Sequence, residues 1–270
     1  MAYVNLRYGS YNLGMETEVC ILLPENRLQK PEDRRGKKYP VLYLLHGHSD
    51  DNTGFLRKTK IEVLFRDIEA IVVMPNANRS FYTNMKHGHY YEDFIAEELP
   101  QVIESYFPAS SRREDRFVAG YSMGGYGAFK LALKYPDRYA AAASMSGAFN
   151  VMQDIEKISS MFAVPDAVRN MYDAFGSKQE YEEGPENVYN LARQAARSGG
   201  PLPRLFACCG LQDSLLENNR ELRDFMQKEV PEIPFEYKES NGTHNWYYWD
   251  NALPDIITFL GYQLHPDLLL

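Results

Sequence analysis

The chain has 270 residues, of which 44% are hydrophobic and 24% are charged, a balance that excludes a disordered polypeptide and fits one domain over residues 1–270. Its net charge of −8 argues against nucleic acid and anionic membrane surfaces as partners, because an acidic surface repels phosphates. The first residues (MAYVNLRYGSYNLGME) lack a basic region followed by an apolar one, so no signal peptide is visible and we expect a cytoplasmic protein.

Seven short apolar runs predict β-strands. The first, residues 17–23, alternates apolar with other residues, which is typical of a half-buried strand near a sheet edge. The other six are nearly continuous and end at turn residues, which is typical of strands buried on both faces. They cover residues 41–45, 71–74, 116–121, 139–144, 205–209 and 235–238.

Amphipathic segments lie between these strands. Apolar residues at helical spacing predict helices over residues 95–106, from about 125 to 133, and over 222–226 and 253–260, with Pro100 kinking or breaking the first. Strands that alternate with helices predict the α/β class with a doubly wound, mostly parallel sheet. The stretch 149–197 lacks strand patterns, so we expect a short helical insertion, or cap, over the C-terminal edge of the sheet.

Gly120-Tyr121-Ser122-Met123-Gly124 matches G-x-S-x-G between a predicted strand and a predicted helix. This strand–turn–helix context is the one that a nucleophile elbow requires. The glycines leave room for a tight, strained turn at Ser122, and the helix N-terminus directs N–H groups to where negative charge develops. The motif predicts an α/β-hydrolase fold with Ser122 as the nucleophile.

A serine nucleophile needs a histidine base and an acid that orients it, and in this fold the chain order is Ser, Asp or Glu, His. Two histidines follow Ser122. His244 lies between the last strand and the last helix and is the predicted base, whereas His265 lies past that helix. Asp213 follows the strand before the last and is the predicted acid.

Among the other aspartates that follow the nucleophile, we considered three as the acid, and none fits its position. Asp224 falls within a helical stripe, Asp173 lies in the insertion, and Asp250 begins a helix, where capping accounts for it.

The backbone amides of Met123 and His48 are the predicted oxyanion donors, because one should follow the nucleophile and the other should follow an early strand. Gly47 permits close approach of the backbone there. His46 and His48 precede Ser122, which does not fit the triad order, and a metal pair at this spacing has no third ligand nearby. We expect neither a metal nor a cofactor, since the acyl chemistry needs only side chains and amides.

Several segments together resemble the esterase D family, especially its small tributyrin-esterase and cinnamoyl-esterase members. They are LLHGHSDDNTGF (44–55), VVMPNANRSFYTN (72–84), YYEDFIAEELPQVIESYFP (90–108), GYSMGGYGAFKLALKYPDRYAAAASMSG (120–147), CCGLQD (208–213) and GTHNWYYWDNALPDIITFL (242–260). They span most of the chain outside the insertion. Phe55 stands where many relatives have Trp.

The resemblance implies hydrolysis of short acyl esters through Ser122, Asp213 and His244, with oxyanion amides from His48 and Met123. Members of the family include carboxylesterases, feruloyl and acetyl-xylan esterases, S-formylglutathione hydrolases and mycolyl transferases. The glutathione-thioester branch usually carries Leu-Thr-Cys at positions 48–50, which is absent here. The resemblance also implies a homo-oligomer, which light scattering would test.

A small-molecule ester is the expected partner, and we expect Gly47, Ser49, Tyr82, Tyr121 and Trp246 to contact it. Tyr82 belongs to a segment, 79–84, that resembles a pocket-edge motif of the small esterases. Trp246 is expected to line the acyl or alcohol side, beside the predicted base. Core packing is the alternative role for these aromatic residues.

The sequence therefore predicts a serine carboxylesterase that acts on short-chain acyl esters, with acetyl or feruloyl esters of plant polysaccharide among the candidates. Two alternatives with the same triad are an acyltransferase and an S-formylglutathione-type thioesterase. An alternative of another class is a catalytically silent hydrolase fold that serves as a binding module.

Overall fold

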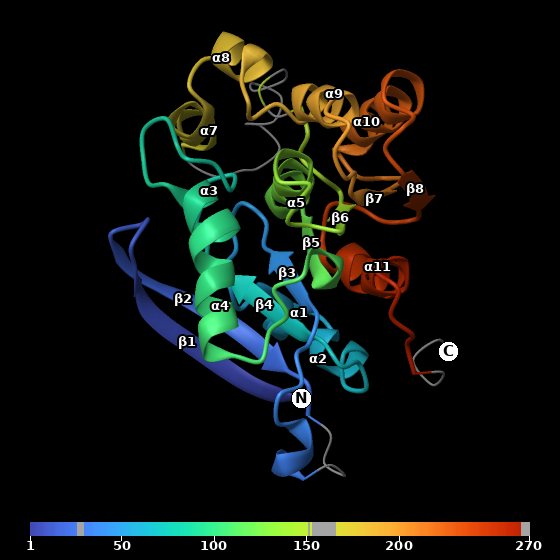
Figure 1. Cartoon of the computed structure of the whole chain (residues 1–270). Helices are drawn as coiled ribbons and strands as arrows, with labels where there is room; N and C mark the ends of the chain where they lie inside the picture. The colour runs from blue at the N-terminus through green and yellow to red at the C-terminus, as the bar shows by residue number, and fades with distance from the viewer. Residues whose placement is uncertain (26–29, 151, 153–165, 266–270) are drawn as a thin grey trace.

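The computed structural model describes residues 1–25, 30–150, 152 and 166–265 of the chain. Its centre is an eight-stranded sheet in the order β1-β2-β4-β3-β5-β6-β7-β8, with helices on both faces (Figure 1). β2 is antiparallel to both of its neighbours, β1 and β4. All pairs from β4 to β8 are parallel, as the alternation of strands and helices predicts.

The elements follow in chain order. The strands are β1 (Ala2–Ser10), β2 (Met15–Leu23), β3 (Val41–Leu45), β4 (Ile71–Pro75), β5 (Arg116–Tyr121), β6 (Ala141–Met145), β7 (Arg204–Gly210) and β8 (Phe235–Ser240). The helices are α1 (Gly54–Lys58), α2 (Ile61–Leu64), α3 (Tyr91–Asp93), α4 (Leu99–Tyr106), α5 (Met123–Lys134), α7 (Ala167–Phe175), α8 (Lys178–Glu183), α9 (Val188–Arg197), α10 (Leu216–Glu229) and α11 (Trp246–Phe259). Among the described residues, none of these helices is long and apolar enough to cross a membrane.

Two apolar layers sandwich the sheet. On β3, Tyr43 faces the layer that α4, α5, α9 and α10 complete, and the neighbouring Leu42 and Leu44 face the layer that α1, α2 and α11 complete. This division follows from the two-residue period of a strand, which sends successive side chains to opposite faces. Continuous apolar runs are therefore the sequence pattern of these strands, and the helices cover both faces.

The chain reverses its direction of winding at β3. β4 lies on one side of β3, and β5, the next strand along the chain, lies on the other. In open α/β sheets a crevice forms at such a switch point, outside the carboxyl ends of the parallel strands. The segments that follow β3 and β5 therefore meet at one place.

The N-terminal strand β1 has no counterpart among the predicted strands. It pairs with β2 along the whole of both strands, from Ala2 opposite Leu23 to Ser10 opposite Met15. β2 is not half-buried as expected, because the layer that α1, α2 and α11 complete covers its second face. Cys20 and Leu22, which alternation assigns to solvent, are fully buried.

Pro100 follows a change of helix type within a helix that runs unbroken from Tyr91 to Tyr106, so the expected break is absent and the kink stays a prediction. The helix from α3 to α4 passes through a π-helical turn at Phe94–Glu98, and Pro100 sits in the first turn of α4. Proline has no N–H to donate to the carbonyl four residues earlier. That carbonyl, of Ala96, accepts a hydrogen bond from Arg138 Nη1 at 3.0 Å instead.

The described part of the expected insertion contains α7, α8 and α9. α9 packs against α5 and α10 and so belongs to the layer over the sheet. α7 reaches the end of β3, where Asn170 Oδ1 lies 2.7 Å from His48 Nε2. That this stretch acts as a cap within a single domain stays a prediction.

Candidate active site

Ser122 occupies a strained turn between β5 and α5. Its φ of 54° and ψ of −119° are rare for a residue with a side chain. Gly120 and Gly124 make the turn possible because no side chain fits there. A Cβ on Gly124 would lie 2.1 Å from the Leu45 carbonyl oxygen, and one on Gly120 would lie 2.5 Å from the Gly124 carbonyl.

A continuous hydrogen-bonded chain joins the three side chains of the predicted triad. His244 Nε2 lies 3.0 Å from Ser122 Oγ. On the other side of the ring, Nδ1 lies 3.1 Å from each carboxylate oxygen of Asp213. The Asp213 side chain is fully buried, and its Oδ1 also accepts the N–H of Leu215 at 2.8 Å. This backbone bond fixes the orientation of the carboxylate.

The loops that carry the acid and the base are bonded to each other. Gln212 N donates to the Gly242 carbonyl at 2.9 Å, and Gly242 N donates to Gln212 Oε1 at 2.8 Å. Gly210, at the end of β7, lets the loops approach this closely, because a Cβ there would lie 2.2 Å from the Gly242 oxygen. The spacing between Asp213 and His244 is therefore held by backbone contacts.

The loop after β3 lies beside the turn of Ser122, and the side chain of its own residue His46 holds it in place. His46 is buried, and its Nε2 accepts the N–H of Ala77 at 2.9 Å. The proton is therefore on Nδ1, which donates to the Gly47 carbonyl at 2.7 Å. Because the Gly47–His48 peptide is trans, its N–H points away from that carbonyl.

Burial controls the charge of both histidines in this loop. Desolvation lowers the pKa of His46. It also lowers the pKa of His48 to about 4, against the opposing effect of the Asn170 hydrogen bond. Both rings are therefore neutral near pH 7, which the acceptor role of His46 Nε2 requires.

A cavity of about 300 Å³ opens at Ser122 and His244. Of the predicted substrate contacts, Gly47, Ser49, Tyr121 and Trp246 line it, as does His48. The remaining lining residues, which the sequence did not single out, are Asp50, Lys58, Asn245 and Trp249. Of these four, only Trp249 could have been predicted from the sequence, as the second tryptophan of the Trp246-x-x-Trp249 segment.

Tyr82 does not reach this cavity. Its side chain is fully buried, and its hydroxyl donates to the His46 carbonyl at 2.9 Å. The structure therefore corrects the predicted substrate contact: Tyr82 supports the loop after β3 from below.

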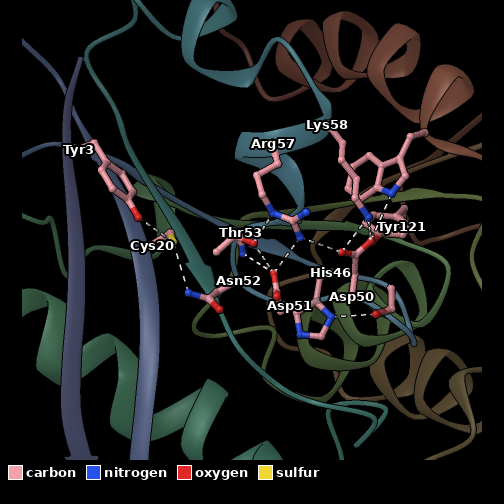
Figure 2. A network of polar contacts seen from close by, with 12 residues as sticks. Tyr3, Cys20, His46, Asp50, Asp51, Asn52, Thr53, Arg57, Lys58 and Tyr121 are labelled. Carbon is pink, nitrogen blue, oxygen red and sulfur yellow. Dashed lines mark hydrogen bonds and ion pairs between the residues drawn. The ribbon is translucent and has the colours of Figure 1, made fainter.

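Aromatic rings form one wall of the cavity. Tyr121 stacks on Trp249 with ring centroids 4.1 Å apart. Trp249 meets the His244 ring edge-on at 5.0 Å. Trp246 completes the cluster, 4.6 Å from Tyr121. Figure 2 shows Tyr121 beside Asp50 and Lys58, which bring charge to the rim of this wall.

The alternative carboxylates lie elsewhere. Asp224 is on α10, where it pairs with Arg223. Asp250 lies inside α11 and accepts the N–H of Lys60 at 2.8 Å, while Asn245 caps the helix. The expected capping role of Asp250 is therefore wrong. Within the described ranges, no group of three or more His, Cys, Asp and Glu side chains could hold a metal ion.

A family model described as "Putative esterase" matches residues 10–260 of the chain. The chain belongs to this esterase family. The esterase is 28% identical to the acetyl esterase of Caldicellulosiruptor saccharolyticus over 272 residues, which cover 96% of this chain and 98% of that protein.

Two solved structures from Staphylococcus aureus resemble the esterase along its length. The fluorophosphonate-binding serine hydrolase FphF, solved with bound substrate, has a TM-score of 0.87 and 32% identity, covering 97% of this chain and 99% of its own. The S-formylglutathione hydrolase FrmB has a TM-score of 0.84 and 32% identity, covering 96% and 98%. The expected esterase D-like family, α/β-hydrolase fold and serine carboxylesterase class are confirmed.

Proposed function

We propose that the esterase hydrolyses small, short-chain acyl esters through an acyl-enzyme on Ser122. The observation that carries this proposal is the continuous chain from Ser122 Oγ through the two nitrogens of His244 to Asp213, with contacts of 3.0 and 3.1 Å. This is the arrangement in which an imidazole can take a serine proton while a carboxylate stabilises the imidazolium.

In the first half-reaction Ser122 Oγ attacks the ester carbonyl and His244 Nε2 accepts the hydroxyl proton. The same proton then passes to the departing alcohol, which leaves Ser122 acylated. In the second half-reaction His244 takes a proton from water, and the resulting hydroxide attacks the acyl carbonyl. The acid is released, and the proton returns to Ser122.

Both tetrahedral intermediates carry a negative oxygen that needs hydrogen-bond donors. Met123 is the first residue of α5, and N–H groups in the first turn of a helix have no acceptor within the helix. The amide of His48 is the second proposed donor, because the bond from His46 orients its peptide. Such fixed donors need no rearrangement during the reaction.

The cavity supports a small substrate. Its volume of about 300 Å³ is at the low end for ligand sites, which hold roughly 300–1,000 Å³. The aromatic wall formed by Tyr121, Trp246 and Trp249 is suited to a short acyl or aryl group. We therefore expect rates on p-nitrophenyl esters to fall as the acyl chain lengthens from C2 to C8. Equal rates along this series would contradict the short-chain assignment.

The decisive variant is Ser122→Ala, with Ser49→Ala as its matched control. Both lose a hydroxyl at the cavity, but Ser49 is exposed and lies outside the triad. We expect Ser122→Ala to lower kcat on p-nitrophenyl acetate by about 10⁶. Ser49→Ala should lower it far less, because it removes only a predicted substrate contact. An active Ser122→Ala enzyme would refute the proposed mechanism.

Thioesters are a second candidate substrate class, because FrmB, which is named for S-formylglutathione, covers nearly the whole chain. The same nucleophile would attack a thioester carbonyl. S-formylglutathione and p-nitrophenyl acetate, compared on the same preparation, separate the two classes. A kcat/KM higher on the thioester would favour this second function.

A further inference from the structure

Asp50 is a nearly buried carboxylate beside the nucleophile that the proposed mechanism does not use. Its side chain is 11% exposed. Oδ2 accepts hydrogen bonds from the Tyr121 hydroxyl at 3.0 Å and from Trp246 Nε1 at 3.2 Å. Lys58 Nζ lies 2.8 Å from the same oxygen and 3.0 Å from Oδ1, as Figure 2 shows.

These partners come from the segments that carry the nucleophile and the base. Tyr121 is the residue before Ser122, and Trp246 begins α11, two residues after His244. The backbone N–H of Asp50 donates to the Gly47 carbonyl at 3.2 Å, the same carbonyl that His46 holds. One residue therefore joins the turn of Ser122, the loop of His244 and the loop after β3, here called the oxyanion loop because it carries the proposed oxyanion donor His48.

The position of Tyr121 determines the position of Gly47. The ring packs so closely on this glycine that an added Cβ would lie 2.3 Å from Tyr121 Cε2. A shift of the ring would push against the Gly47–His48 peptide. The hydroxyl of Tyr121 is anchored at Asp50, so the carboxylate fixes the ring that supports the oxyanion loop.

We propose that Asp50 is a positioning residue for the reaction. Through Tyr121 and Trp246, it holds the His48 amide, Ser122 and His244 in the relative positions that catalysis needs. This inference rests on the proposed function, because it concerns the geometry of that same site. Asp50 acts through its neighbours, so its loss should lower kcat and leave KM nearly unchanged.

The chain provides a matched control in the next residue. Asp51 is also a carboxylate, but its side chain is 48% exposed. It accepts the backbone N–H and the hydroxyl of Thr53 and pairs with Arg57. Asp50→Asn and Asp51→Asn therefore remove the same charge from neighbouring positions, and only the first reaches Tyr121 and Trp246.

The experiment measures kcat and KM on p-nitrophenyl acetate for the wild type, Asp50→Asn, Asp51→Asn, Tyr121→Phe and the double variant Asp50→Asn/Tyr121→Phe. Removal of a whole oxyanion donor lowers kcat by about 10²–10³, so we expect a displaced donor in Asp50→Asn to lower kcat about 10- to 100-fold. KM should stay within about threefold, and Asp51→Asn should match the wild type. Tyr121→Phe should lower kcat less, and the double variant should fall short of the product of the two single effects.

Three outcomes would overturn the proposal. In the first, Asp50→Asn has the same kcat as Asp51→Asn. In the second, Asp50→Asn raises KM and leaves kcat unchanged, which indicates a direct substrate contact. In the third, the kcat loss in the double variant equals the product of the losses in Asp50→Asn and Tyr121→Phe. Should Asp50→Asn fail to fold, Tyr121→Phe removes one of the same bonds without changing charge, and a wild-type kcat in it would equally overturn the proposal.

A second readout separates this inference from the proposed function. The rate at which a fluorophosphonate labels each variant needs no ester hydrolysis. A wild type that labels but leaves p-nitrophenyl esters intact refutes the function alone, and slower labelling of Asp50→Asn than of Asp51→Asn still supports the positioning role. Equal labelling rates would contradict it.

Discussion

Nδ1 of His46 donates a hydrogen bond to the carbonyl oxygen of Gly47, 2.7 Å away, and so fixes the plane of the peptide that carries the His48 amide. The opposite ring nitrogen is committed to Ala77, which leaves one tautomer. The orientation of a proposed oxyanion donor thus depends on a buried side chain that lies outside the triad.

Two substitutions at His46 separate its two bonds. The side-chain amide of Asn can take the place of Nδ1 and keep the bond to the Gly47 carbonyl. The side-chain amide of Gln can take the place of Nε2 and keep the bond from Ala77 N–H. We therefore expect His46→Asn to keep more of kcat than His46→Gln, with a gap of about tenfold, since losing a donor altogether costs about 10²–10³. Steady-state kinetics on p-nitrophenyl acetate measures the gap. The reverse order would show that the Ala77 bond, and not the Gly47 bond, matters for catalysis.

Acid should destabilise the fold through the buried histidines. An unfolded histidine takes up a proton near pH 6.5, whereas the pKa of His48 in the folded chain is lowered to about 4 by burial. Between these values the unfolded chain binds more protons, so the free energy of unfolding falls as pH falls. The expected loss from His48 is of order 3 kcal/mol between pH 7 and pH 4.

Urea unfolding at pH 7, 5.5 and 4 measures this loss. His48→Asn should flatten the dependence in that window, because the residue that takes up the proton is gone. An unchanged slope in this variant would assign the acid sensitivity to other groups.

A buried ion cluster lies beneath the loop after β3. Lys130 on α5 is fully buried and pairs with Glu186 and, at 2.6 Å, with Glu92. It also donates to the carbonyl of Tyr82 at 2.9 Å, whose hydroxyl holds His46. We expect Lys130→Met to cost about 3–5 kcal/mol in unfolding free energy, because it leaves buried carboxylates without their central partner.

The control for that variant is Lys37→Met, since Lys37 pairs with Glu69 on the surface and such pairs contribute about 0–1 kcal/mol. Chemical denaturation compares the two. A loss below about 1 kcal/mol in Lys130→Met would mean that the cluster does not stabilise the fold.

Gly124 tests the steric argument for the elbow. Its added Cβ would meet the Leu45 backbone at 2.1 Å, whereas one on Gly9 of β1 would lie 3.6 Å from the mobile end of Glu16. We expect Gly124→Ala to lower kcat by about 100-fold or more, because the elbow and the oxyanion loop must separate. Gly9→Ala should keep wild-type activity. Comparable kinetics in the two variants would remove the requirement for glycine at the elbow.

The triad geometry was predictable because the signals for its members are local. The glycines of the elbow and the chain order of Ser122, Asp213 and His244 reflect constraints that the turn and the fold impose. Asp50 carries no such signal, since an Asp-Asp pair after a loop resembles a solvated turn. Tyr121 and Trp246, the partners through which it would act, lie 71 and 196 residues away, and only the packed fold brings them to Asp50.

The wrong prediction for Tyr82 and the missed strand β1 also reflect contacts that only the folded chain makes. Tyr82 lies in a segment that resembles a pocket edge, but whether an aromatic side chain faces a cavity or the core depends on its neighbours in space. β1 is an edge strand whose alternating residues are only partly buried, and such half-exposed patterns are weaker signals than the continuous runs of β3 or β5.

The site of covalent labelling tests the central claim most directly. The esterase would be treated with a fluorophosphonate, digested, and mapped by mass spectrometry, with Ser122→Ala and Ser49→Ala treated alongside. We expect a single adduct on Ser122 in the wild type and in Ser49→Ala, and none in Ser122→Ala. An adduct on another serine, or equal labelling of Ser122→Ala, would contradict the assignment of the nucleophile.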